Sequence, residues 1–149
     1  MPTLETPLVK GMIHRPDAPA HMMRLRPAGR EVIVRLATRD GAGKGAGKGE
    51  GEEIARSRDA MVLIEIGRDV HDPAYYLPLA DAAGLVATDR TTHCPLKGDT
   101  TYYDLAPSDA RGAVAEIAWS YADPLEWARD LRGLVAFDPA RVGIETAPL

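Results

Sequence analysis

Residues 92–103, with the sequence THCPLKGDTTYY, bring together most of the reactive side-chain types that this chain contains. A histidine, a thiol, an amine, a carboxylate and two phenols lie within this one segment. Groups of these kinds serve nucleophilic catalysis, metal binding and the recognition of polar ligands. Each chemistry requires its own spacing of residues, so the segment can be compared with each in turn.

The thiol of Cys94 is a candidate nucleophile, with His93 or His21 as its general base. The thiolate is the reactive form of a cysteine, and a nearby positive charge such as that of Lys97 favours it. Pro95, however, holds the residue before it in an extended conformation, and cysteine often serves as a small buried apolar side chain. These residues favour a structural role for Cys94, with thiol catalysis as the alternative.

A metal site is not predicted, and no cofactor is indicated. Cys94 is the one cysteine of the chain, which excludes an internal disulfide and a multi-thiolate zinc site. Neighbouring residues of an extended chain point to opposite sides, so His93 and Cys94 are poorly placed to bind one ion together. The four histidines are scattered, and none belongs to an H-x-x-x-H pattern.

Recognition of a polar ligand is the chemistry that the segment fits best. Lys97-Gly98-Asp99 has the composition of a turn, and period-two alternation then places Thr100 and Tyr102 on one face of the following strand. Lys97 would anchor an anion and aromatic side chains would form the walls of a cleft. The predicted ligand-binding residues are His21, Tyr75, Tyr76, His93, Lys97, Tyr102 and Trp119. The alternative is a solvated lysine beside tyrosines that only pack.

Short segments with alternating or β-branched residues must position these groups. Strands are expected over residues 31–37, 54–57, 61–66, 74–78, 84–88, 100–105, 113–119, 134–137 and 141–145. Many short strands separated by turns predict a mainly β fold. The glycine-rich residues 41–51 match no phosphate-binding loop and predict a flexible hairpin insertion.

One short helix is expected near the C-terminal end. Asp123 would be its N-cap and Pro124 its first residue, with Glu126 completing a capping box. Leu125, Ala128 and Leu131 would share the buried face of this helix.

The composition indicates one globular domain. The chain has 149 residues and a net charge of −4, which disfavours binding to nucleic acid. No apolar run approaches the roughly 20 residues that cross a bilayer, and no signal peptide is evident, so a cytoplasmic protein is expected. Residues 1–20 are expected to form an irregular strap and residues 21–149 a single β domain.

Several segments in order resemble a known family. They are residues 21–27 (HMMRLRP), VIVRL, IARSRDA followed by LIE, AYYLP, THCPLKGDTTYYDL, AWSYADPL and GLVAF, within residues 20–145. This pattern is similar to that of domain of unknown function 427, which also carries a nucleotidyltransferase-like label. The resemblance implies a β-tent (Mss4-like) fold of two small antiparallel sheets, but the C-x-x-C zinc ligands of such folds are absent here. It implies no catalytic residues.

The sequence therefore predicts a module that binds a small polar or anionic ligand in a cleft near residues 92–99. An enzyme with Cys94 as nucleophile is the alternative, and nucleotidyltransferase-like activity is a further one that the label suggests. The carboxylate pair that would hold Mg²⁺ in such an enzyme is not visible. A structural or interaction domain without pocket chemistry is the third interpretation.

Overall fold

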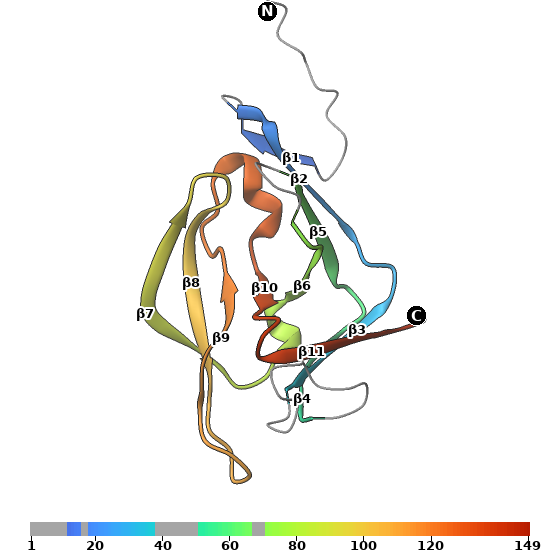
Figure 1. Ribbon diagram of the computed structural model, residues 1–149, viewed down its shortest axis with the longest axis vertical. Coiled ribbons are helices and arrows are strands. Elements are labelled where there is room, and N and C mark those ends of the chain that lie inside the picture. The colour runs from blue at the N-terminus through green and yellow to red at the C-terminus, as the bar shows by residue number, and fades with distance from the viewer. Residues whose placement is uncertain (1–11, 16–17, 38–50, 67–70) are drawn as a thin grey trace, which may run out of the picture.

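The computed structural model describes residues 12–15, 18–37, 51–66 and 71–149, which form two antiparallel sheets (Figure 1). The larger sheet has eight strands in the order β1-β2-β5-β6-β10-β9-β8-β7, and the smaller has three in the order β11-β3-β4. The strands are β1 (Met12–Arg15), β2 (Ala18–Pro27), β3 (Glu31–Leu36), β4 (Glu53–Ser57), β5 (Met61–Ile66), β6 (Ala74–Pro78), β7 (Leu85–Cys94), β8 (Gly98–Leu105), β9 (Val114–Ser120), β10 (Leu134–Phe137) and β11 (Val142–Ala147).

The mainly β prediction is confirmed, and each of the strands expected from residue 31 onward is present. The expectation of two antiparallel sheets is confirmed as well, with eight strands in one sheet and three in the other. The expected irregular strap contains β1 and the start of β2, and β1 pairs mainly with Met22–Arg24, which lie beyond the strap. Apart from Gly51, the predicted hairpin insertion lies outside the described residues. The β-tent likeness and the domain division stay predictions.

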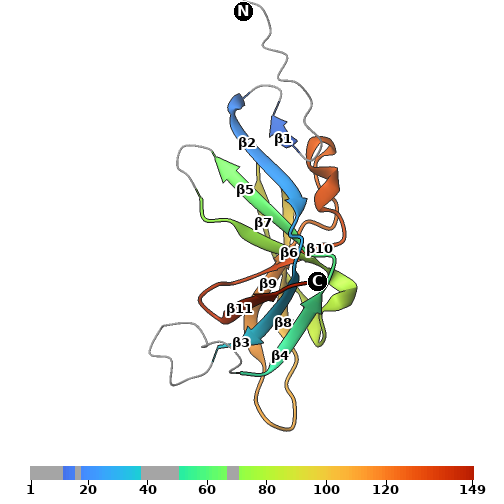
Figure 2. The same ribbon diagram turned by 90° about the vertical axis from the view of Figure 1, so that its right-hand side faces the viewer.

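Strand β10 joins two halves of the larger sheet. It pairs with β6 through Leu134 and Val135, and with β9 through residues 135–137. Figure 1 shows β7, β8 and β9 on one side of β10, with β6, β5 and β2 on the other. The small sheet lies at the opposite end of the molecule from β1, as Figure 2 shows.

The core is divided between the two faces of the larger sheet, because its strands alternate. On β6, Leu77 belongs to one buried cluster with Val32 and Val34 of the small sheet. Tyr76 belongs to a second cluster on the other face, with Met23 of β2 and Leu131. Each long strand therefore contributes to two packed layers with successive residues.

The helix expected near the C-terminus is a 3-10 helix, Glu126–Leu131 (η3). It begins after Leu125 without a side-chain cap, so the predicted capping box of Asp123 and Glu126 is wrong. Pro124 instead forms a bridge with Gly98, because the adjacent β7–β8 hairpin uses this segment as a partner. The predicted buried face is confirmed for Ala128 and Leu131, which are 0% exposed.

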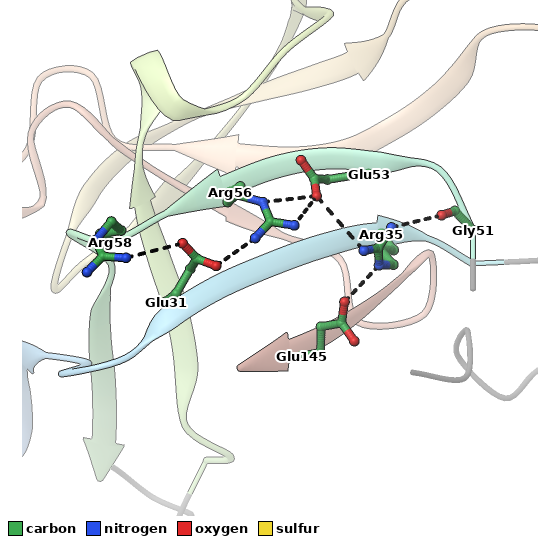
Figure 3. A network of polar contacts seen from close by, with 7 residues as sticks. All are labelled: Glu31, Arg35, Gly51, Glu53, Arg56, Arg58 and Glu145. Carbon is green, nitrogen blue, oxygen red and sulfur yellow. Dashed lines mark hydrogen bonds and ion pairs between the residues drawn. The ribbon is translucent and has the colours of Figure 1, made fainter. Parts of the chain in front are cut away.

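A ladder of charges crosses the exposed face of the small sheet (Figure 3). The Nε of Arg35 bonds Glu145 of β11 at 2.8 Å, and its Nη2 lies 3.9 Å from Glu53 of β4. Arg56 bonds both Glu53 and Glu31 at 2.6 Å. Such exposed pairs add little stability each, but together they connect all three strands. We therefore assign this ladder a structural role, in which its ion pairs hold the three strands together.

Candidate functional site

A cleft of about 550 Å³ opens on the face of the larger sheet that carries the second buried cluster. Its lining combines aromatic rings with ionisable and hydroxyl groups, a composition typical of small-ligand sites. The lining residues are Leu63, Glu65, His71, Asp72, Ala74, Tyr76, Thr92, Cys94, Lys97, Thr100, Tyr102, Trp119, Tyr121, Asp138 and Pro139.

Strand register explains why these residues share one surface. Tyr102 lies opposite Trp119 across β8 and β9, and Thr100 lies opposite Thr92 across β8 and β7. Directly opposed residues of antiparallel strands project to the same face of a sheet. The expected phase of β8 is therefore correct, since Thr100 and Tyr102 both line the cleft.

The β7–β8 hairpin places Lys97 in the cleft by burying its own tip. The turn comprises residues 95–97 and not the expected 97–99, because Gly98 and Asp99 already belong to β8. Leu96 at the tip is 0% exposed, and the Lys97 carbonyl accepts a 2.9 Å hydrogen bond from the Leu125 amide. The tip of the hairpin is thus packed into the second cluster and is not exposed to solvent.

Lys97 forms an ion pair with Glu65 of β5. Its Nζ donates to Glu65 Oε1 at 2.9 Å, and the two side chains are only 12% and 16% exposed. Burial alone would lower the pKa of Lys97, but Tyr76, Tyr121 and Glu65 outweigh it and raise that pKa above its ordinary value. At neutral pH Lys97 is consequently an ammonium and cannot act as an amine nucleophile.

Two buried phenols flank this ion pair. Burial raises the pKa of Tyr121 to about 12, although Lys97 and a hydrogen bond with Thr100 oppose the shift. Burial also raises the pKa of Tyr76, whose hydroxyl has the Trp119 side chain as a hydrogen-bond partner. Both phenols are therefore neutral at neutral pH, and Glu65 is the negatively charged partner of Lys97.

Tyr102 is held at the edge of the cleft by its neighbours. Its hydroxyl lies 2.9 Å from the Thr92 hydroxyl, and Arg90 stacks 4.7 Å from the ring centroid. Arg90 in turn forms an ion pair with Glu116, a residue of β9 with a positive φ of 49°. The ring is therefore fixed by two contacts from β7, and Glu116 of β9 holds Arg90 in place, which pre-organises this wall.

The structure brings five of the predicted site residues together in the cleft, namely Tyr76, Cys94, Lys97, Tyr102 and Trp119. It does not bring in His93, whose ring lies 2.8 Å from Asp99 with 60% of the side chain exposed. Tyr75 packs against the first buried cluster on the opposite face. His21 lies on β2, and its side chain is outside the described part of the molecule.

Sequence reasoning missed several lining residues, of which Glu65 and Tyr121 are the most consequential. Glu65 had a visible signal, because a carboxylate within the apolar strand MVLIEI requires a partner if it is buried. Its partner Lys97 is 32 positions away, and no local pattern identifies it. His71 also lies near, with Nε2 4.0 Å from Glu65 Oε2.

No other feature of the described residues is as good a candidate for a functional site as this cleft. A second hollow of about 750 Å³ is lined mainly by small side chains, and its Arg111 bonds Glu52 at 2.6 Å. Among the residues that the structure covers, no three His, Cys, Asp or Glu side chains are grouped to hold a metal ion. None of the helices described there has the length and apolar character needed to cross a membrane.

Comparison with known proteins gives one family. The model of a family described as domain of unknown function (DUF427) matches residues 47–147, which contain every described lining residue of the cleft. No curated protein matches the chain significantly.

Proposed function

Because the chain belongs to the DUF427 family, whose description states no activity, we propose its function from the cleft itself: it binds a small polar ligand there. The observation that carries this proposal is the ion pair of Lys97 and Glu65, which lies in a hollow walled by aromatic residues. Apolar side chains of similar volume would often stabilise a fold at least as well as a largely buried ion pair. Stability alone therefore does not explain why the pair is present. Its position in an open cleft suits recognition of a ligand.

The walls of the cleft support the same proposal. Trp119 and Tyr102 oppose each other across β8 and β9 and remain partly exposed, so a flat molecule could contact their rings. Beside these rings lies the exposed Thr92 hydroxyl, which pairs with the Tyr102 hydroxyl and keeps further hydrogen-bonding capacity. Apolar surface for affinity and a few fixed polar groups for orientation are the usual elements of a small-ligand site.

Nuclear magnetic resonance of the ¹⁵N-labelled protein tests this proposal with a library of small polar aromatic compounds. Binding compounds should shift the Trp119 indole N–H signal and the amides of Cys94 and Lys97. They should also slow alkylation of Cys94 by iodoacetamide, because that thiol lines the cleft.

Variants provide the specificity control. Trp119→Leu should lower the affinity for the compounds that bind. His93→Ala should leave this affinity unchanged, since His93 lies outside the cleft. Compounds that shift only the surroundings of Arg111 and Arg141, or a library with no effect on the cleft signals, would contradict the proposal.

A further inference from the structure

The charges around the cleft favour a ligand of one sign. Three lining residues carry carboxylates, namely Glu65, Asp72 and Asp138, whereas Lys97 is the lining residue with a permanent positive charge. Lys97 is already neutralised by Glu65 at 2.9 Å. Asp138 lies 3.4 Å from Arg141, which is outside the lining. The Lys97 ammonium is therefore already paired and attracts an anionic ligand weakly. The carboxylates of Asp72 and Asp138 would repel such a ligand.

The same cleft already stabilises a positive charge of its own. The Lys97 ammonium lies 5.7 Å from the centroid of the Tyr121 ring while it bonds Glu65. An aromatic face and a carboxylate together form the environment that proteins use for ammonium groups. Trp119, whose indole is the strongest aromatic partner for cations, offers a second such face in the cleft.

We propose that the cleft selects an organic cation, an ammonium or guanidinium group attached to a flat apolar body. This inference rests on the proposed function, since it names the class of ligand for the same site. The positive group contacts the Trp119 ring and the exposed Asp72 carboxylate, both of which line the cleft, and the apolar body lies against the partly exposed Tyr102.

Three probes with one skeleton and different charges test the proposal. They are 2-phenylethylammonium, 3-phenylpropanoate and 3-phenylpropan-1-ol, each titrated while the Trp119 indole signal is followed. The dissociation constant of the ammonium should be lower than that of either other probe by about tenfold. Added salt should weaken the binding of the ammonium but not that of the neutral alcohol, because salt screens the attraction between charged partners.

Two matched variants locate the charge that matters. Asp72→Asn should raise the dissociation constant of 2-phenylethylammonium several-fold, whereas Asp99→Asn removes the same charge from outside the cleft and should leave it unchanged. An equal loss in both variants would overturn the proposal, because only general charge would then attract the cation.

The outcomes separate this inference from the proposed function. Tightest binding of 3-phenylpropanoate would overturn cation selectivity while leaving the cleft as a ligand site. The same conclusion follows if no probe binds but other library compounds shift the cleft signals. If nothing in the library shifts them, the proposed function fails as well.

Discussion

Replacing Lys97 by methionine would remove the ammonium of the cleft ion pair while keeping most of the side-chain volume. Glu65, which is 16% exposed, would lose its cationic partner at 2.9 Å. Removing one partner of a fully buried pair costs about 3–5 kcal/mol, so we expect about 2–4 kcal/mol for this partly open site. Lys97→Met should lower the free energy of unfolding by this amount, measured as a lower urea midpoint with an unchanged slope of the transition.

A double variant tests whether this loss comes from the uncompensated carboxylate. Lys97→Met combined with Glu65→Gln should be more stable than Lys97→Met alone, with a coupling energy of about 1–3 kcal/mol. Arg132→Met is the control, since Arg132 is a cation with 65% of its side chain exposed and should contribute little to stability. A loss below about 0.5 kcal/mol for Lys97→Met, with no coupling, would refute the reasoning.

The pH dependence of this difference follows from the pKa of Lys97. Because that pKa is raised in the folded state, the stabilisation is complete below the unfolded value of about 10.4 and is lost as pH rises through the folded value. The stability difference between the wild type and Lys97→Met should therefore stay constant from pH 7 to about pH 10. A difference that disappears below pH 9 would show that another group carries the effect.

Three further predictions concern the supports of the cleft. Gly98→Ala should cost about 2 kcal/mol or more in chemical denaturation, because Gly98 has a φ of +118° and an added Cβ would lie 3.2 Å from the Leu125 nitrogen; a neutral effect would disprove the docked hairpin tip. Tyr121→Phe should abolish an ultraviolet tyrosinate transition near pH 12, and wild-type stability should fall between about pH 10 and 12 because the unfolded phenol ionises first; a transition complete by pH 10.5 would contradict its burial. Ser120→Ala should cost about 1–3 kcal/mol in the same denaturation assay, since it leaves the buried Tyr103 hydroxyl without its 2.8 Å partner, and an unchanged midpoint would show that this hydroxyl finds another partner.

The strands were predictable because their signal is local. MVLIEI and AYYLP are short runs rich in apolar, β-branched or aromatic residues, and both occur as strands with the expected bounds. Successive residues of a strand point to opposite faces, so only one of Tyr75 and Tyr76 can line the cleft, but local sequence does not state which. That choice depends on the packing of Tyr76 with Met23 and Leu131, which are distant in the chain.

The site residues were harder to predict because tertiary contacts overrode local signals. The Asp123-Pro124 pair has the composition of a helix start, yet Pro124 bridges Gly98 of a hairpin about 25 residues earlier. The Lys-Gly-Asp composition predicts a turn whose Lys97 either anchors a ligand or is solvated, but neither interpretation places the fully buried Leu96 at its tip. The apolar Leu96 directly before the predicted turn was the available signal for a docked tip.

The short strand β10 has a consequence for how the protein is assembled during synthesis. Strands β5 and β6 on one side and β7, β8 and β9 on the other are adjacent in sequence, so each group can form hairpins as it leaves the ribosome. The two groups become neighbours in one sheet only when residues 134–137 emerge and insert between β6 and β9. Glu65 belongs to the first group and Lys97 to the second, so a nascent chain that stops before residue 134 has both partners of the ion pair but lacks the strand that joins their two groups into one sheet.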